Sequence, residues 1–499
     1  DESLAGLVEF ARDAKMVAHN AEFDRTFTTR HPSGYPLLDN IWIDSLDLAR
    51  IALPRMRSHR LIDLVKAFGA PTSTHRADDD VAATCALFRI LLAAVHEMPP
   101  ALVKCIALLA PVEQWNTAVV FQHFAQPEVK PFSLKELRHE SMTSYERRPR
   151  IDAKMIQTME YPTAEDIAQA FSPTGIVGKL YVDFDPREEQ LTMAQEVRAA
   201  LEASENLIVE AGTGVGKSMA YLVPAVLMAK KNNIAIGVAT KTNALLDQLV
   251  YHELPALAQS LGDVTYAPLK GFSHYPCLRK VNRFVKEGVK MVDVQGTEHS
   301  QAPSLGALLS FIDQTDYDDM DSLKMDYRVV PRRAVTTTSH DCLRRKCPFY
   351  GTTCFVHGAR RFAETADVVV TNHTLLFCDA AADNGLLPPV RHWILDEAHG
   401  AEAEARRAFS LEIAAEDVTR LAQKVASGES RNVYARAERK LSSSLKNDGA
   451  TLFEGLIGKA KSAGDMFAAA AHEFAPHIKD LLYFDPNKRS RSYDRTELW

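Results

Sequence analysis

A glycine-rich segment that ends in lysine and serine has the residues needed to bind phosphate. The segment Ala-Gly-Thr-Gly-Val-Gly-Lys-Ser spans 211–218, between an apolar run at 206–210 and an apolar helical pattern at 219–228. In a strand, loop and helix of this order, backbone N–H groups at the helix N-terminus cradle phosphates. Lys217 would neutralise the β- and γ-phosphates and the Ser218 hydroxyl would ligate Mg²⁺. We predict an ATP site whose glycine-rich cradle comprises Gly212, Thr213, Gly214 and Gly216.

An acidic box downstream supplies the other groups that phosphoryl transfer requires. Residues 393–399 are Trp-Ile-Leu-Asp-Glu-Ala-His, an apolar strand pattern that ends in two carboxylates. At the end of a buried strand, Asp396 would bind Mg²⁺ and Glu397 would orient the attacking water. The loop and the box together predict ATP hydrolysis, in which Lys217, Asp396 and Glu397 are catalytic.

Four of the seven cysteines lie between the loop and the box. Cys277 is followed by a long insert, and then Cys342, Cys347 and Cys354 are separated by four and six residues. Thiolates in such a set bind structural zinc or an iron–sulfur cluster, and the spacing alone does not separate the two. The Cys347-Pro348 step and the position within an ATPase favour the cluster. The remaining cysteines, Cys85, Cys105 and Cys378, are predicted to be core residues.

Two clusters near the N-terminus combine histidine with carboxylates. An apolar strand pattern at 16–20 precedes Asp24, and His75 lies five residues before Asp80, where a helical pattern begins and extends over 81–92. Carboxylates can hold two divalent ions, Mg²⁺ or Mn²⁺, while a histidine takes the proton from the attacking water. We therefore predict that Asp24 and Asp80 are metal ligands and that His75 is the general base of phosphodiester hydrolysis.

At these residues the chain resembles the DEDDh exonucleases, the family of the proofreading subunits. That family's second motif resembles residues 19–24 and its third resembles residues 75–80. Its first motif, an Asp-x-Glu on the opening strand, supplies two more metal ligands. Asp1-Glu2 lacks this spacing, so we expect the first motif to lie upstream and this segment alone to be a weak nuclease. Asp44 and Asp47 are expected to cap or flank a helix.

The elements that must position the ATPase groups alternate between strands and helices. Further apolar strand patterns occur at 234–239 and 368–370. Strands separated by helices predict a parallel sheet of the RecA type. After the first of these strands, Thr240-Lys241-Thr242 would either hold a nucleic-acid phosphate or form a solvated helix cap.

This order of motifs resembles the XPD and DinG iron–sulfur helicases of superfamily two, and the DinG group most closely. The resemblance extends from about Phe171 to His399 and includes Lys270-Gly271, the cysteine set and the acidic box. It implies a [4Fe–4S] cluster, ATP-driven 5′→3′ translocation on single-stranded DNA, and unwinding of tailed or branched duplex. Ahead of the loop, Arg187 and Gln190 lie in a segment that resembles the one by which helicases bind adenine.

Composition indicates a protein with several folded domains. The 499 residues are 46% hydrophobic, yet no apolar stretch reaches the roughly 18 residues of a membrane span, and no N-terminal signal is evident. Irregular cysteine spacing argues against a disulfide framework. We expect a cytoplasmic protein with no membrane association and no obligate protein partner. Because the net charge is −7, DNA contacts would come from local basic patches, such as 332–333, 344–346 and 360–361.

The predicted fold class is α/β. A truncated RNase H-like exonuclease domain precedes a RecA-like parallel-sheet helicase domain, which contains an inserted iron–sulfur domain and is followed by the start of a helical arch-like insert. The acidic run at 313–326 is predicted to be a solvated loop. The chain begins with Asp1 and stops at Trp499 within a pattern, so we expect a fragment. The predicted segments are 1–95 (exonuclease-like), 96–164 (linker), 165–276 (RecA-like, first part), 277–360 (iron–sulfur), 361–400 (RecA-like, second part) and 401–499 (helical).

The function that these motifs favour is a DinG-type DNA helicase fused to a 3′→5′ exonuclease domain, acting in DNA repair or replication. Two alternatives stay open. In one, the protein is chiefly a nuclease whose ATP-binding half regulates it. In the other, the protein is a binding module whose cysteines hold zinc and whose loop senses nucleotide.

Overall fold

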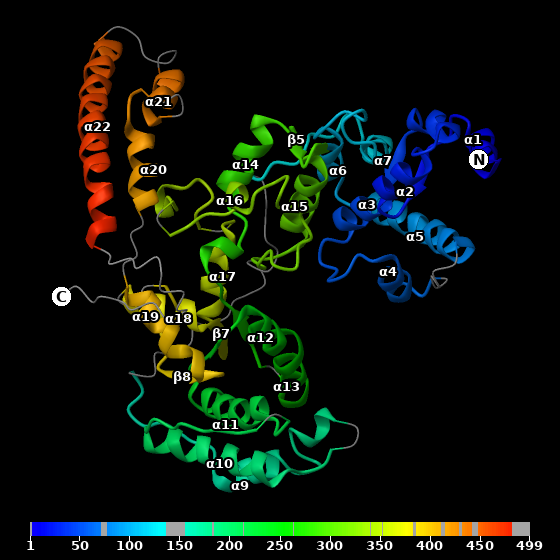
Figure 1. Ribbon diagram of the computed structural model, residues 1–499. Coiled ribbons are helices and arrows are strands. Elements are labelled where there is room, and N and C mark those ends of the chain that lie inside the picture. The colour runs from blue at the N-terminus through cyan, green and yellow to red at the C-terminus, as the bar shows by residue number, and fades with distance from the viewer. Residues whose placement is uncertain are drawn as a thin grey trace. The chain divides into compact units, whose positions relative to one another are not determined.

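A computed structural model describes residues 2–70, 77–135, 155–181, 184–212, 214–262, 264–339, 341–351, 353–382, 386–410, 415–428, 432–441 and 448–481 (Figure 1). The chain divides into two compact units, Asp1–Ala408 and Phe409–Trp499. Helices dominate both units, and parallel strands occur in the first. These features confirm the predicted mixed α/β class.

A pair of parallel strands organises the N-terminal segment. β1 (Met16–Ala18) pairs with β2 (Trp42–Asp44), so the strand predicted near 16–20 is confirmed. The Asp44 side chain accepts a hydrogen bond from Leu46 N at 2.8 Å and caps the following helix, as predicted. The helices are α1 (Glu2–Ala11), α2 (Ala21–Thr28), α3 (Ser45–Ala52), α4 (Leu61–Ala67), α5 (Ala77–Glu97), α6 (Pro100–Ala107) and α7 (Ala118–Phe124).

The long helix α5 shows why one cysteine prediction is wrong. Its buried residues recur every fourth position, at Ala83, Leu87, Leu91 and Val95. Cys85 falls between two of them and points to the opposite side, so it is exposed, whereas Cys105 on α6 is buried as predicted. Within the described ranges, no single helix is long and apolar enough to cross a membrane, although the bent pair of α5 and α6 reaches that length and composition together.

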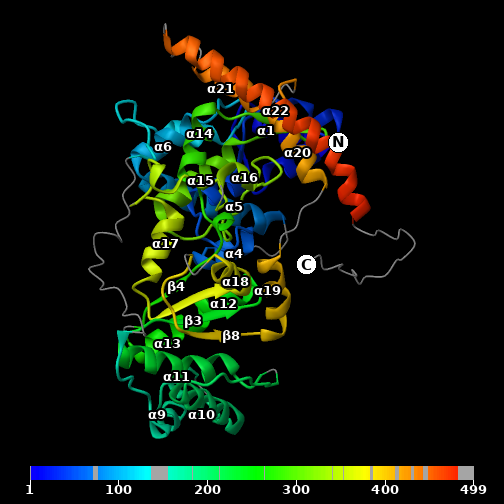
Figure 2. The same ribbon diagram turned by 90° about the vertical axis from the view of Figure 1, so that its left-hand side faces the viewer.

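Four parallel strands form the central sheet, in the order β4-β7-β3-β8. Their bounds are Tyr266–Pro268 (β4), Val368–Asn372 (β7), Ile236–Thr240 (β3) and His392–Leu395 (β8). Side chains alternate between two cores, because Val368 and Val370 pack in the core that contains α11 (Lys217–Asn232), while Val369 packs in the other. Figure 2 shows α11 along one side of this sheet. The predicted parallel sheet is therefore confirmed.

Other helices complete the core on the α11 side of the sheet. They are α9 (Ala164–Ala170), α10 (Glu188–Ala203), α12 (Asn243–Gln248) and α13 (Leu254–Leu261). A capping box starts α9, because Thr163 and Asp166 bond reciprocally to each other's backbone N–H groups. Leu246, Leu254 and Leu257 are fully buried and seal the core against α11.

The prediction of a strand at 206–210 is wrong. That run is extended chain outside the sheet, and the side chains of Leu207, Ile208 and Val209 are 41%, 96% and 41% exposed. An apolar run without alternation is buried only when it has neighbours on both faces. Among the described residues, β8 forms the last strand of the sheet, and each of its residues is half-buried. The loop nevertheless leads directly into α11.

The insert between Cys277 and Cys342 is folded. Its elements are α14 (Leu278–Glu287), β5 (Met291–Val294), β6 (Thr297–Ser300), α15 (Ala302–Gln314) and α16 (Arg332–Val335), and α17 (Phe355–Ala363) follows the last cysteine of the set. The acidic run is not the solvated loop that was predicted. Met320 and Leu323 are buried, and Asp319 is only 9% exposed. The carboxylates are drawn inward by a buried lysine, described below.

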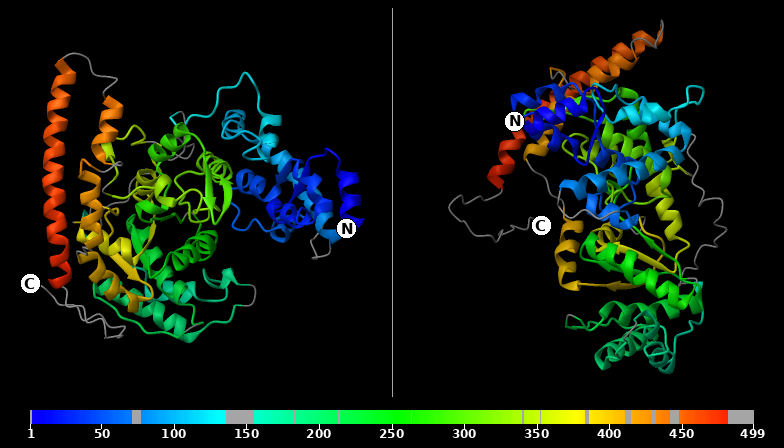
Figure 3. Two further views of the ribbon diagram at one scale, coloured as in Figure 1. Left: turned by 45° about the horizontal axis from the view of Figure 1, so that its top comes forward. Right: turned by 90° about the vertical axis from the view of Figure 1, so that its right-hand side faces the viewer.

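Helices account for the described residues after the acidic box, as predicted. They are α19 (Ala401–Phe409), α20 (Ala415–Val425), α21 (Val433–Leu441) and α22 (Asp448–Leu481). Within the second unit, α20 runs beside the long α22 (Figure 3). Small residues permit the approach, since Ala422, Ala468 and Ala471 are buried and a Cβ on Gly464 would clash with the Val425 carbonyl oxygen.

Candidate functional site

Two glycines give the phosphate-binding loop its shape. Gly214 and Gly216 both have φ +84°, a conformation that glycine adopts without the strain a side chain would add. A Cβ on Gly216 would clash with the Gln190 amide. α11 begins immediately after, at Lys217. The loop therefore presents the N-terminus of a 16-residue helix, where backbone N–H groups bind anions.

The two residues predicted to contact adenine also hold the loop. The Gln190 side chain is 5% exposed, and its Nε2 donates to the Gly216 carbonyl at 2.8 Å. Arg187 donates to the Gly214 carbonyl. Both residues therefore stabilise the backbone that receives the phosphates. Gly212 belongs to the loop, and a Cβ there would meet nothing within 4 Å, while Thr213 lies outside the described residues.

The loop and the acidic box meet through an ion pair. Lys217 Nζ lies 3.5 Å from Glu397 Oε1, and His399 Nδ1 lies 3.3 Å from the other Glu397 oxygen. His399 Nε2 is in turn 2.8 Å from Lys241 Nζ. A neutral His399 that accepts from Lys241 carries its proton on Nδ1, facing Glu397. A chain of polar contacts thus joins the phosphate-binding lysine to the segment after β3.

The carboxylate of Asp396 stands at the end of a strand, where it could bind a cation. It follows the last residue of β8, and its N–H donates to the Ala239 carbonyl at 2.8 Å. Burial, and then the neighbouring Glu397 carboxylate, raises the pKa of Asp396 above its usual value. Mg²⁺ would favour the ionised form, because a divalent ion is the largest charge in such a site. Ser218 stands in the first turn of α11 beside Lys217.

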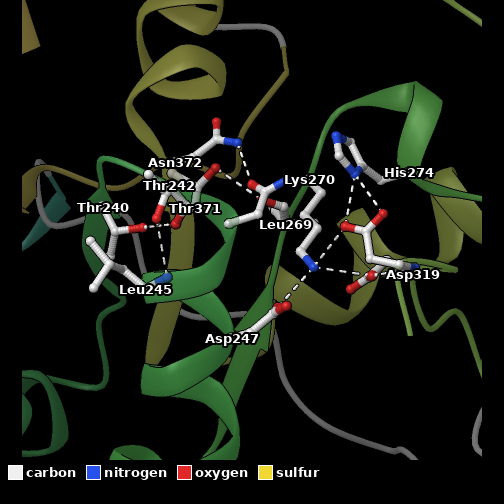
Figure 4. A network of polar contacts seen from close by, with 12 residues as sticks. Thr240, Thr242, Leu245, Asp247, Leu269, Lys270, His274, Asp319, Thr371 and Asn372 are labelled. Carbon is white, nitrogen blue, oxygen red and sulfur yellow. Dashed lines mark hydrogen bonds and ion pairs between the residues drawn. The ribbon is translucent and has the colours of Figure 1, made fainter. Parts of the chain in front are cut away.

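The segment after β3 is tied into the edge of the sheet (Figure 4). Thr242 caps α12 by accepting from Leu245 N at 3.3 Å, and Thr240 Oγ1 donates to the Thr242 carbonyl at 2.9 Å. Asn372 Nδ2 donates to Asn243 Oδ1 at 2.7 Å and so links β7 to α12. Thr242 therefore forms the helix cap that was one of the two alternatives for 240–242, while the Lys241 side chain contacts His399.

A buried lysine, Lys270 of the Lys270-Gly271 pair, joins three segments in a way that its sequence neighbours do not indicate. The Lys270 side chain is 1% exposed, and its Nζ lies 2.8 Å from Asp247, 3.0 Å from Asp319 and 3.0 Å from Asp321. Figure 4 shows Asp247 on α12, whereas Asp319 comes from the acidic run. Burial lowers the pKa of Lys270, but the three carboxylates outweigh it and hold the pKa above its usual value. Lys270 therefore stays charged. Two of its three partners, Asp319 and Asp321, belong to the acidic run, which is the sequence feature that could have indicated a buried cation.

Asp321 extends this network toward the first cysteine. His274 Nδ1 lies 2.8 Å from Asp321, and Arg332 also pairs with that carboxylate. Burial raises the pKa of Asp321, yet the hydrogen bonds from His274 and Arg332 hold it well below its usual range. The Cys277 N–H donates to the Val335 carbonyl at 2.7 Å. The loop from Lys270 to Cys277 is thus held at both ends.

All four cysteines of the set line one pocket. Cys277, Cys342, Cys347 and Cys354 share it with the apolar side chains of Phe272, Phe349 and Tyr350 and with Arg279 and Arg344. Burial raises the pKa of the Cys354 thiol to about 11, and the three other thiols add to this effect. Thiols crowded in an apolar pocket resist ionisation unless a metal binds them as thiolates. Cys378 lies outside this pocket and is half-buried.

The four thiols of this pocket have the chemistry to hold an iron–sulfur cluster or zinc. The four thiols converge on one pocket, but no three His, Cys, Asp or Glu side chains of the described ranges are close enough to share a single metal ion. Both a [4Fe–4S] cluster and a structural zinc ion can be held by four thiolates, so the donor set suits either group. When bound, the cluster would supply a rigid crosslink between the loop at Cys277 and the segment 342–354.

We predict that the purified protein is coloured and contains iron and acid-labile sulfide. Replacing Cys354 by Ser should lower the iron content, because it removes one of the four thiolates, whereas the exposed Cys85→Ser should leave it unchanged. Metal analysis and visible absorbance measure both variants. Colourless protein that contains zinc and no labile sulfide would contradict the prediction.

The nuclease candidates occupy two separate helix starts. Asp24 lies in the first turn of α2, and Asp80 lies in the first turn of α5. His75 lies outside the described residues. Burial, and then the nearby Asp44 carboxylate, raises the pKa of Asp24. His19 lies 3.0 Å from Ser45 Oγ and 2.8 Å from the His59 carbonyl oxygen, so it links the end of β1 to the start of α3 and to the segment before α4.

Asp47 gives a pH-dependent prediction for this segment. Its side chain is 19% exposed, and burial followed by repulsion from Asp44 raises its pKa to about 7. A carboxyl group whose pKa is raised on folding destabilises the protein above that pKa, and the loss is relieved as the pH falls from 7 toward 4. Asp47→Asn should therefore raise the unfolding free energy by about 2–4 kcal/mol at pH 8 and by much less at pH 5. Denaturant unfolding measures this; equal effects at both pH values, or the same effect from the exposed Asp39→Asn, would contradict it.

Comparison with known proteins separates two regions. A family model described as Exonuclease (RNase_T) matches residues 1–88. The chain is 27% identical over 505 residues to the 3′-5′ exonuclease DinG of Bacillus subtilis, covering 96% of this chain and 51% of that protein. It is 38% identical to the ATP-dependent helicase DinG of Mycobacterium tuberculosis, over 47% of this chain and 38% of that protein.

A further relative is the ATP-dependent DNA helicase YoaA of Haemophilus influenzae, 35% identical over 47% of this chain and 36% of that protein. The chain thus spans about half, or less, of the length of these relatives. The motifs and the comparisons agree, which confirms the resemblance that the sequence predicted. The chain is therefore similar to proteins named DinG over most of its length, and its residues 1–88 match the exonuclease model.

Proposed function

We propose that the chain belongs to an ATP-dependent DNA helicase of the DinG type that carries a 3′→5′ exonuclease domain. The observation that carries the proposal is the 3.5 Å pair between Lys217 and Glu397, which brings the phosphate-binding loop and the acidic box together at one edge of a parallel sheet. In hydrolysis, Lys217 neutralises phosphate charge, Asp396 and Ser218 hold Mg²⁺, and Glu397 orients the attacking water.

The finer parts of the proposal concern the substrate and the setting. Translocation proceeds 5′→3′ on single-stranded DNA, and tailed or branched duplexes are unwound in DNA repair or replication. The cysteine pocket holds a [4Fe–4S] cluster, and the protein acts in the cytoplasm. Basic residues at the cysteine pocket, Arg279 and Arg344, support a DNA contact there, because they place positive charge beside the insert.

A strand-displacement assay tests the motor. The full-length protein with ATP and Mg²⁺ should separate a duplex with a 5′ single-stranded tail and leave one with a 3′ tail intact. Glu397→Gln should bind ATP and separate neither, because it cannot orient the attacking water. Equal separation of both duplexes would overturn the direction, and separation by Glu397→Gln would overturn the ATP-driven motor.

The second candidate is a nuclease whose ATP-binding half regulates it. The match of residues 1–88 to the exonuclease family favours it. It requires that Mg²⁺- or Mn²⁺-dependent degradation from a 3′ end be abolished by Asp24→Ala, and that wild-type protein separate neither tailed duplex. Separation of the 5′-tailed duplex by wild type would exclude this candidate as the main activity.

A further inference from the structure

Helix α15 belongs to the insert and is buried along nearly its whole length, with mostly apolar side chains. Nearly all of its residues are buried, including Leu305, Leu308, Leu309 and Ile312 at 1% exposure or less. A helix that is hydrophobic all round must be covered on all faces. One face therefore needs a partner besides the rest of the insert.

The N-terminal segment supplies that cover. α15 packs against α3 and α6 (Figure 1). At the contact, Gly306 faces both helices: a Cβ there would lie tightly, at 3.1 Å, against Ile51 Cδ1 and in ordinary van der Waals contact, at 3.6 Å, with Ile106 Cγ2. Ile51 and Ile106 are both fully buried. The N-terminal segment and the insert thus share one continuous hydrophobic core.

Polar contacts outside this core also join the N-terminal segment to the rest of the unit. His299 on β6 lies 3.8 Å from Glu22 on α2, the helix that carries Asp24. Elsewhere, the Arg57 guanidinium lies 4.3 Å from the centre of the Tyr251 ring, next to α13. The N-terminal segment is therefore held by the insert and also by the helices of the central sheet.

We propose that α15 is a docking helix whose partner is this chain's own N-terminal segment, made of α3 from the exonuclease-family region and α6 from the linker that follows it, and that this segment and the cysteine-bearing insert move as one rigid body. The consequence for DNA rests on the proposed function: the strand separated at the insert and the nuclease site would keep a fixed spacing. The docking itself needs neither ATP nor DNA. Its failure is therefore distinguishable from failure of the proposed function.

Hydrogen–deuterium exchange of the full chain tests the docking. Gly306→Leu inserts a side chain where Ile51 and Ile106 already fill the space. We expect amide exchange in α3 and α6 to rise about tenfold or more, while α11 keeps its wild-type protection. Gly455→Leu in α22 is the matched control, because a Cβ there meets nothing within 4 Å. Unchanged exchange in α3 and α6 would overturn the proposal.

If Gly306→Leu also raises amide exchange in α11, the variant has unfolded the whole unit and does not test the docking. A milder variant, Ile51→Ala, then tests it. Ile51→Ala removes buried contacts from the α3 side only, so it should raise exchange in α15 across the contact. Wild-type exchange in α15 of this variant would overturn the proposal. A short bismaleimide should also crosslink Glu22→Cys to His299→Cys, identified by peptide mass spectrometry, and the absence of this crosslink would equally overturn it.

Discussion

Lys217→Ala should lower the rate of ATP hydrolysis by about 10²–10³-fold, the usual cost of removing one preorganised charge at a transition state. The expectation follows from the position of Lys217 at the start of α11, where its Nζ already faces Glu397. When ATP binds, the γ-phosphate takes the place of Glu397 as the partner of this cation. Phosphate release by the full-length protein in the presence of single-stranded DNA measures the rate.

The matched control for this prediction is Lys231→Ala, near the other end of the same helix. Lys231 Nζ pairs with Asp166 at 3.4 Å on the surface, and such pairs contribute little. The control should hydrolyse ATP at the wild-type rate. If Lys217→Ala hydrolyses ATP at the same rate as the control, the phosphate-binding loop takes no part in hydrolysis and the prediction is wrong.

Lys270→Met should destabilise the first unit by about 3–5 kcal/mol, because it leaves buried carboxylates without a countercharge. We expect Asp319 to be affected most, because this residue is buried (9% exposed) and Lys270 Nζ lies 3.0 Å from its carboxylate. Iron content should fall as well, because the segment from Lys270 to Cys277 loses its anchor. Denaturant unfolding and metal analysis measure the two effects.

Two further variants make the Lys270 prediction specific. The exposed Lys286→Met on α14 should be close to neutral. The double variant Lys270→Met/Asp319→Asn should recover part of the lost stability, because it removes a buried charge that has no partner. If the double variant is less stable than Lys270→Met alone, the loss does not come from an unpaired carboxylate.

Local order along the chain was sufficient to predict the main parts of the site. The glycine-lysine-serine loop and the acidic box each depend on a few consecutive residues, and the sheet places Lys217 and Glu397 within 3.5 Å as a consequence of its parallel order. The cysteine set was predictable for the same reason, since three of the four fall within 13 consecutive residues of the printed sequence. All four line one pocket.

Features that depend on distant partners were not predictable in this way. The acidic run suggested a solvated loop because its partner, Lys270, lies about 50 residues earlier in the printed sequence, and Asp247 lies earlier still. Cys85 was assigned to a core because cysteine is small and apolar, but the face of α5 is set by Leu87 and Leu91. The apolar run at 206–210 suggested a strand, yet whether a strand pairs depends on its neighbours in space.

The exposed apolar run at 206–210 should also affect how the protein behaves in concentrated solution. Ile208 is 96% exposed, and among the residues that the structure describes β8 is the last strand of the sheet, with one row of backbone groups that no strand there pairs. An exposed β-prone segment and an unpaired strand edge are the two surfaces that join when separate chains add strands to one another. Concentrated samples of this chain should therefore self-associate through β-pairing, and a charged residue in place of Ile208 should keep them dispersed.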